Sequence, residues 1–169
     1  MNQQFQKLKE LLPELTAKCG ESIVITIDGP AGSGKTTEVR QQVTRHLKAG
    51  QDAFLLRLEA LQDGNLVGSF DFELENQVER FEKWKRSKKG GFLFFDALDE
   101  ARLPSSRNES ALEEALDIVS REIGRRQEPV HVLVTSRPSE WLGDGDIRRL
   151  TRFIRQTRDA KRDLGADDP

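Results

Sequence analysis

The sequence predicts a three-layer α/β domain with a mainly parallel sheet of about four or five strands. Short apolar, β-branched runs alternate with longer segments of helical periodicity, which is typical of α/β proteins. The apolar runs are nearly continuous, as expected of parallel strands covered on both faces. The chain has 169 residues, enough for one such domain with a single core.

Residues 1–21 are predicted to form an amino-terminal helix that packs on the core. Apolar side chains recur there at three- and four-residue steps from Phe5 to Leu15. A kink is expected near Pro13, and Gly20 ends the pattern.

The core is expected to span residues 22–145. Strands are predicted from β-branched and aromatic content, and helices from apolar stripes at helical spacing. Gly64 and Gly68 indicate a loop, and no pattern for a fifth strand is found. The predicted order is strand 22–28, helix 35–48, strand 53–58, helix 72–86, strand 92–96, helix 109–123 and strand 130–136.

Residues 146–169 are predicted to form a basic amphipathic helix, over 146–163, followed by an acidic tail. Ile147, Leu150, Ile154 and Leu164 share one face of this helix, and arginines crowd the remainder. The commoner explanation is a helix docked on the domain with a solvated polar side. The alternative is a surface that contacts nucleic acid phosphates or an acidic protein.

Composition limits the compartment and the partners. The chain has 27 lysine and arginine residues against 29 acidic residues, for a net charge of -2. This charge produces no overall positive field that would attract nucleic acid. Nucleic acid is therefore a possible partner but not the favoured one. The single cysteine, Cys19, and the lack of a signal-peptide pattern predict a reducing, cytoplasmic setting. No apolar run approaches the roughly 20 residues that cross a bilayer, so no membrane partner is expected.

A glycine-rich turn between the first strand and the next helix carries the strongest functional signal. Its pattern, G-x-x-x-x-G-K-[ST], lets successive backbone N–H groups surround a phosphate at a helix amino terminus. Lys35 is predicted to contact the β- and γ-phosphates, and Thr36 to be a Mg²⁺ ligand. The predicted nucleotide-binding residues are Gly29, Pro30, Ala31, Gly32, Ser33, Gly34, Lys35, Thr36 and Thr37.

Two further motifs follow predicted strands. Asp96 ends an apolar strand, at the edge where parallel sheets bind ligands, and is predicted to hold Mg²⁺. Asp99 or Glu100 could orient and deprotonate an attacking water, and the alternative for both is ordinary surface charge. After the last strand, Thr135, Ser136 or Arg137 could reach the γ-phosphate or that water.

Taken together, GPAGSGKTT, FLFFDALDEA and LVTSRP resemble the NACHT-like branch of the signal-transduction (STAND) P-loop NTPases, over residues 22–141. In that family the arginine of the third motif, here Arg137, is taken as a γ-phosphate sensor. The resemblance implies ATP and Mg²⁺ binding with slow hydrolysis that drives a conformational switch, often in immune or antiviral signalling. It also allows a protein partner or self-association.

Members of that family are typically longer, with a fifth strand and subdomains that close over the nucleotide. This sequence stops before them, so it is either a piece of a longer protein or a minimal relative. Because closure normally excludes water and completes the catalytic contacts, we expect low nucleotide affinity and low turnover.

The sequence also leaves two alternatives to an ATPase. IDGPAGSGKTT also resembles the phosphate loop of small nucleotide kinases, but the acidic cluster favours water as the acceptor and no arginine-bearing lid is evident. The remaining alternative is a nucleotide-binding module that acts through a nucleic acid or protein partner. The sequence contains no Asn-Lys-x-Asp segment, the motif that would indicate guanine recognition.

His46 and His131 lack metal-ligand spacing, so structural roles are expected for both.

Overall fold

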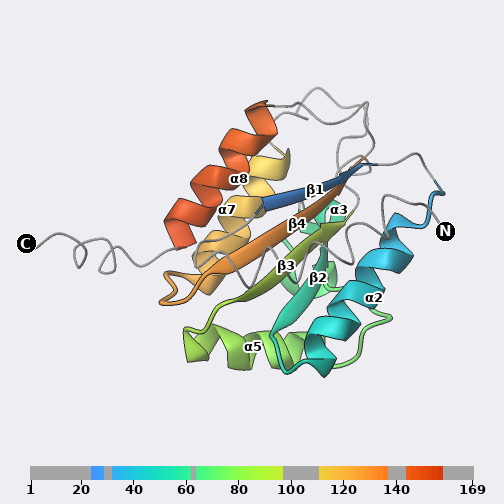
Figure 1. Cartoon of the computed structure of the whole chain (residues 1–169). Coiled ribbons are helices and arrows are strands. Elements are labelled where there is room, and N and C mark those ends of the chain that lie inside the picture. Colours follow the sequence, from blue (N-terminus) through green and yellow to red (C-terminus); the bar gives the residue numbers. More distant parts are fainter. Residues whose placement is uncertain (1–23, 29–31, 62–63, 97–110, 137–143, 158–169) are drawn as a thin grey trace, which may run out of the picture.

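Four parallel strands form one sheet at the centre of the molecule, in the order β1-β4-β3-β2. The computed structural model describes residues 24–28, 32–61, 64–96, 111–136 and 144–157 (Figure 1). The predicted α/β class with a parallel sheet is confirmed. The strands are β1 (Val24–Asp28), β2 (Ala53–Arg57), β3 (Gly91–Asp96) and β4 (Val130–Ser136).

Helices cover both faces of this sheet (Figure 1). One apolar cluster joins α2 to side chains such as Leu55 and Phe94, and the other joins α7 and α8 to side chains such as Leu56 and Phe95. Neighbouring residues of a strand therefore serve opposite faces, as strand geometry requires. The helices are α2 (Lys35–Lys48), α3 (Leu58–Leu61), α4 (Leu66–Ser69), α5 (Gln77–Ser87), α7 (Ala111–Ile123) and α8 (Asp144–Thr157).

The predicted helix 35–48 and strand 130–136 have the bounds that the structure shows. Strand β2 ends one residue early because Leu58 begins α3. The helix predicted from 109 is described from Ala111, and the one predicted from 146 begins at Asp144. The amino-terminal helix predicted for 1–21 and the acidic tail lie outside the described residues.

Two predictions around β2 were wrong. Gly68, expected in a loop, lies in α4, where Asn65 caps the helix by accepting a hydrogen bond from the Gly68 N–H at 2.8 Å. The helix expected from residue 72 begins only at Gln77. The residues before it form turns that cover the edge strand, and the Asp71 N–H donates to the Leu55 carbonyl at 3.0 Å. The mixed apolar spacing there reflects this edge pairing, which protects a strand that would otherwise expose its backbone.

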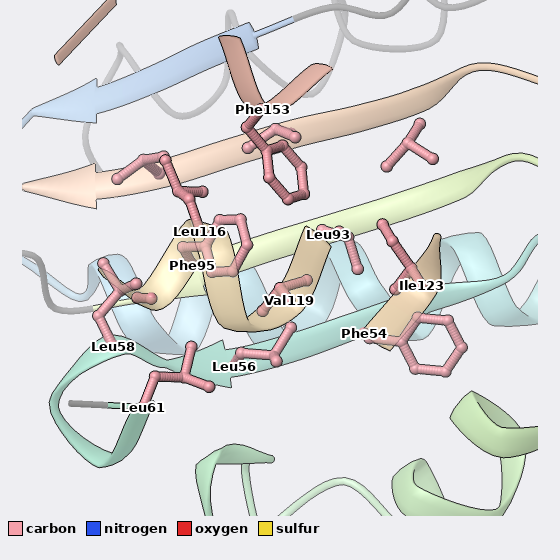
Figure 2. Packing of buried hydrophobic residues seen from close by; sticks show 14 of the residues in the cluster. Phe54, Leu56, Leu58, Leu61, Leu93, Phe95, Leu116, Val119, Ile123 and Phe153 are labelled. Atoms are coloured by element: carbon pink, nitrogen blue, oxygen red, sulfur yellow. The ribbon is translucent and has the colours of Figure 1, made fainter. Parts of the chain in front are cut away.

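Helix α8 is docked on the domain by Leu150 and Ile154 of the predicted stripe together with Phe153. Leu150 and Phe153 are buried, and Ile154 packs against the same cluster. The Phe153 ring meets Phe95 edge to face, with centroids 6.3 Å apart, and lies beside Leu116 of α7 (Figure 2). Leu164 lies outside the described residues, so Phe153, which the sequence analysis omitted, is the main anchor found here.

A buried arginine holds the carboxyl end of α8. The Arg126 guanidinium lies 3.7 Å from the Trp84 ring centroid, and the backbone N–H of Arg126 donates to the Thr157 carbonyl at 2.7 Å. Burial lowers the pKa of Arg126 to about 10. The loop before β4, helix α5 and helix α8 are therefore joined at one point.

Replacing Phe153 by alanine is expected to lower the free energy of unfolding by about 3–5 kcal/mol, because the change leaves a cavity between α8 and the sheet. Urea unfolding measures the loss, with Gln156→Ala on the exposed side of the same helix as a control that stays near the parent. A loss below about 1 kcal/mol for Phe153→Ala would mean that α8 is not docked in solution.

Candidate functional site

The second half of the glycine-rich turn is described, and it has the backbone of an anion-binding loop. Gly32 and Gly34 have φ angles of +71° and +83°, a left-handed region that favours glycine. Lys35 begins α2 directly after Gly34, and no side chain caps this helix. Backbone N–H groups at the start of α2 are thus presented toward the loop, where the helix dipole favours an anion.

The space and the polar atoms of this loop fit a phosphate. A Cβ atom added at Gly32 or Gly34 would meet no described atom within 4 Å, so the positive φ angles, and not crowding, require these glycines. The buried Oγ of Ser33 has no hydrogen-bond partner among the described residues. Because an unpaired buried hydroxyl is costly, an anion that accepts from it would stabilise the loop.

The predicted loop residues are described in part. Lys35 and Thr36 are half-buried and Thr37 is exposed. Gly29, Pro30 and Ala31 lie outside the described residues, so their expected contacts remain predictions.

Asp96 lies at the carboxyl end of β3 and is buried, with 4% of its surface exposed. The Thr135 Oγ1 donates a hydrogen bond to Asp96 Oδ1. The Thr135 hydroxyl is thus directed at Asp96 in this structure, and its expected contact with the γ-phosphate remains a prediction. This hydrogen bond fixes the orientation of the carboxylate at the sheet edge.

Strand order places Asp96 at the same sheet edge as the glycine-rich turn. In the aligned register, Asp28 of β1 pairs with Ser136 of β4, and Phe95 of β3 pairs with Val134. The carboxyl ends of β1, β4 and β3 are therefore nearly level. Two strand spacings of about 4.8 Å put the ends of β1 and β3 roughly 10 Å apart, with β4 between them. An ion held by the loop and by Asp96 through water fits this separation.

The three residues predicted to act on the reacting phosphate are not among the described ones. Asp99, Glu100 and Arg137 follow β3 and β4 in the sequence, and their catalytic roles remain predictions. Ser136 ends β4, and its side chain is not described.

An ion-pair cluster that the sequence analysis missed ties α2 to the segment covering β2. The Arg40 guanidinium contacts both carboxylate oxygens of Asp71, with its Nη2 at 2.8 Å from Oδ2, and it also pairs with Glu73 at 2.9 Å. The hydrogen bonds with Asp71 raise the pKa of Arg40, and the charge of Asp96 adds to this effect. Asp71 is distant from Arg40 in sequence, so local patterns gave no signal for the contact.

The two histidines lie at the opposite end of the sheet, where both pack against Phe92. His46 stacks on Phe92 with ring centroids 3.8 Å apart, and His131 lies 4.9 Å from the same ring. Burial lowers the pKa of both, and the charge of His46 adds to the effect on His131. Within the described ranges, no group of three acidic, histidine or cysteine residues could by itself hold a metal.

Comparison with known proteins shows the fold alone. No protein-family model matches the sequence. No curated protein matches it significantly. A solved structure of a DNA replication initiation factor is similar, with a TM-score of 0.52 and 17% identity over 94% of this chain and 46% of that chain. Together with the sheet order and the helices on both faces, this likeness supports the three-layer α/β fold with a parallel sheet. The chain spans about half the length of that neighbour.

Among the helices that the structure describes, none is long and apolar enough to cross a membrane.

Replacing Thr135 by valine, which has nearly the same shape, is expected to lower the free energy of unfolding by about 1–3 kcal/mol, because buried Asp96 loses its donor. Thr135→Ser keeps the hydroxyl and should lie much closer to the parent. Urea unfolding of both variants tests the contact, and equal stability of Thr135→Val and the parent would contradict it.

The histidines predict a pH dependence. Because burial lowers their pKa values in the folded state, the unfolded chain binds protons first, so stability should fall as pH drops through about 6.5. Unfolding measured at about pH 7.5 and pH 6.0 checks this, since few other side chains titrate there. The double variant His46→Gln/His131→Gln should lose most of the dependence, and an unchanged dependence would contradict the assignment.

Proposed function

We propose that the chain binds Mg·ATP at the glycine-rich loop and hydrolyses it slowly. The observation that carries this proposal is the placement of two features at one sheet edge. One is the left-handed Gly32 and Gly34 leading into the uncapped start of α2. The other is buried Asp96, fixed by Thr135.

In this proposal the loop binds the triphosphate and the neighbouring side chains neutralise its charge. Lys35 places a cation on the β- and γ-phosphates, while backbone N–H groups and Ser33 donate to phosphate oxygens. Thr36 and Asp96 would hold Mg²⁺, whose charge stabilises the developing negative charge of the leaving phosphate. The oxygen ligands of these two residues suit that ion.

Residues beyond the strand ends supply the remaining chemistry. Glu100 or Asp99 accepts a proton from the attacking water, and Arg137 contacts the γ-phosphate. These roles come from the resemblance to the NACHT-like family and from the position of both segments directly after β3 and β4. In that family slow hydrolysis serves a switch in regulation or defence, and we propose the same use here.

Two substitutions separate binding from turnover. Lys35→Ala is expected to weaken ATP binding about tenfold or more, because a charge-assisted contact is worth about 1.5–3 kcal/mol. Glu100→Gln is expected to retain binding and to lose about 10²-fold or more in turnover, because it removes the proton acceptor. Titration with labelled ATP and single-turnover hydrolysis measure the two effects.

Lys48→Ala is a matched control, since Lys48 is an exposed lysine at the far end of the same helix. It should leave binding and turnover unchanged. Hydrolysis that survives intact in both Lys35→Ala and Glu100→Gln would place the activity elsewhere. ADP formation that requires an added nucleoside monophosphate would identify a kinase in place of an ATPase.

A further inference from the structure

The solvent side of α8 and the loop after α7 form an open, positively charged hollow of about 580 Å³, here called the arginine hollow. Four arginines line it with two uncharged polar side chains, and no carboxylate belongs to its lining. Its lining residues are Arg125, Arg148, Thr151, Arg152, Arg155 and Gln156.

Within the described ranges, most of this charge has no acidic partner. Arg125, Arg148 and Arg155 are exposed, and in the part of the chain that the structure describes none of them forms an ion pair. Arg152 pairs with Glu113 at 2.8 Å. Like charges held close together repel, so this surface favours a polyanion that would neutralise them.

The arginines are spaced along one side of the helix at a repeat that suits a phosphate backbone. Arg148, Arg152 and Arg155 are separated by four and three residues, which places them on one face. At about 1.5 Å per residue they span roughly 10 Å. One strand of a duplex has a phosphate about every 3.4 Å along the axis, so this span matches about three phosphates. Arginine forks bind phosphate oxygens well, and Thr151 and Gln156 can donate further hydrogen bonds.

The helix is held rigidly enough to present this face. Leu150 and Phe153 are buried on its other side, and the Arg126 N–H holds its last residue, Thr157. Helix α8 can therefore dock on the domain and bind a ligand through its arginine face at the same time, although the sequence analysis gave these two roles as alternatives.

We propose that the arginine hollow binds the phosphate backbone of duplex nucleic acid without reading its sequence. Charge complementarity carries this choice, because the described lining residues are arginines with one threonine and one glutamine and include no aliphatic or aromatic residue that would anchor a peptide. The interaction goes beyond nucleotide binding at the glycine loop. It needs no overall positive charge, because the hollow concentrates the charge locally.

Fluorescence anisotropy with a labelled DNA duplex of about 20 base pairs tests the proposal. Affinity should be weak, with Kd of roughly 10⁻⁶ to 10⁻⁴ M near physiological salt. Three to four arginine–phosphate contacts should give a log Kobs against log salt slope of about -3. The double variant Arg148→Gln/Arg155→Gln should bind the duplex more weakly by a factor of about ten or more. The magnitude of its salt slope should be smaller by about 2.

A second double variant controls for the change in net charge. Arg45→Gln/Lys48→Gln removes the same charge from exposed positions on α2, which packs on the opposite face of the sheet from α8 (Figure 1). It should bind within about twofold of the parent. Thermal melts should show that both variants are folded, since all four substituted side chains are exposed.

Three results would overturn the proposal. The first is no duplex binding at about 50 mM salt. The second is a loss of affinity that is the same in the two double variants, because general charge would then explain it. The third is displacement of the duplex by polyglutamate as effectively as by unlabelled duplex at equal charge, which would indicate a surface for acidic proteins.

Discussion

The level parallel register of β1, β4 and β3 is the constraint on which the rest of the molecule depends. It brings the end of β1, where the glycine loop begins, to the same edge as Asp96 and Thr135. A slip of one residue between β3 and β4 would turn their apolar side chains to the wrong faces and would separate the carboxylate from its donor. Core packing and site geometry are therefore fixed by the same hydrogen bonds.

Long-range contacts hold the elements around this edge. Arg40 joins α2 to Asp71 in the segment that covers β2, so the helix that begins at Lys35 is tied to this segment near its middle. On the other face, Phe153 fixes α8 against β3. Because each helix is held by its buried face, its polar side remains available for ligands, at the glycine loop in one case and at the arginine hollow in the other.

Much of the fold could be predicted because it depends on local patterns. Helix 35–48 follows a glycine turn that its own sequence specifies, and strand 130–136 is a continuous apolar run. The segment before α5 was mispredicted because pairing of Phe70 with Leu56, which is a tertiary contact, overrides its apolar spacing. Phe153 was missed for a similar reason, since only the packed structure shows which helix face meets the sheet.

The residue types of the candidate site could be predicted from the sequence, but the hydrogen bonds and ion pairs between them could not. Lys35, Thr36 and Asp96 follow from motifs, whereas the hydrogen bond from Thr135 depends on the register between two strands. Arg40 and Asp71 are joined only when β2 and its covering segment come together. Sequence spacing carries no information about either contact.

Paramagnetic broadening by Mn²⁺ in place of Mg²⁺, with a non-hydrolysable ATP analogue, tests most directly whether the loop and Asp96 share one ion. Amide signals of Lys35, Thr36, Asp96 and Thr135 should broaden together, and Asp96→Asn, which keeps an acceptor for Thr135, should abolish the effect. Broadening centred elsewhere, or unchanged in Asp96→Asn, would contradict the site.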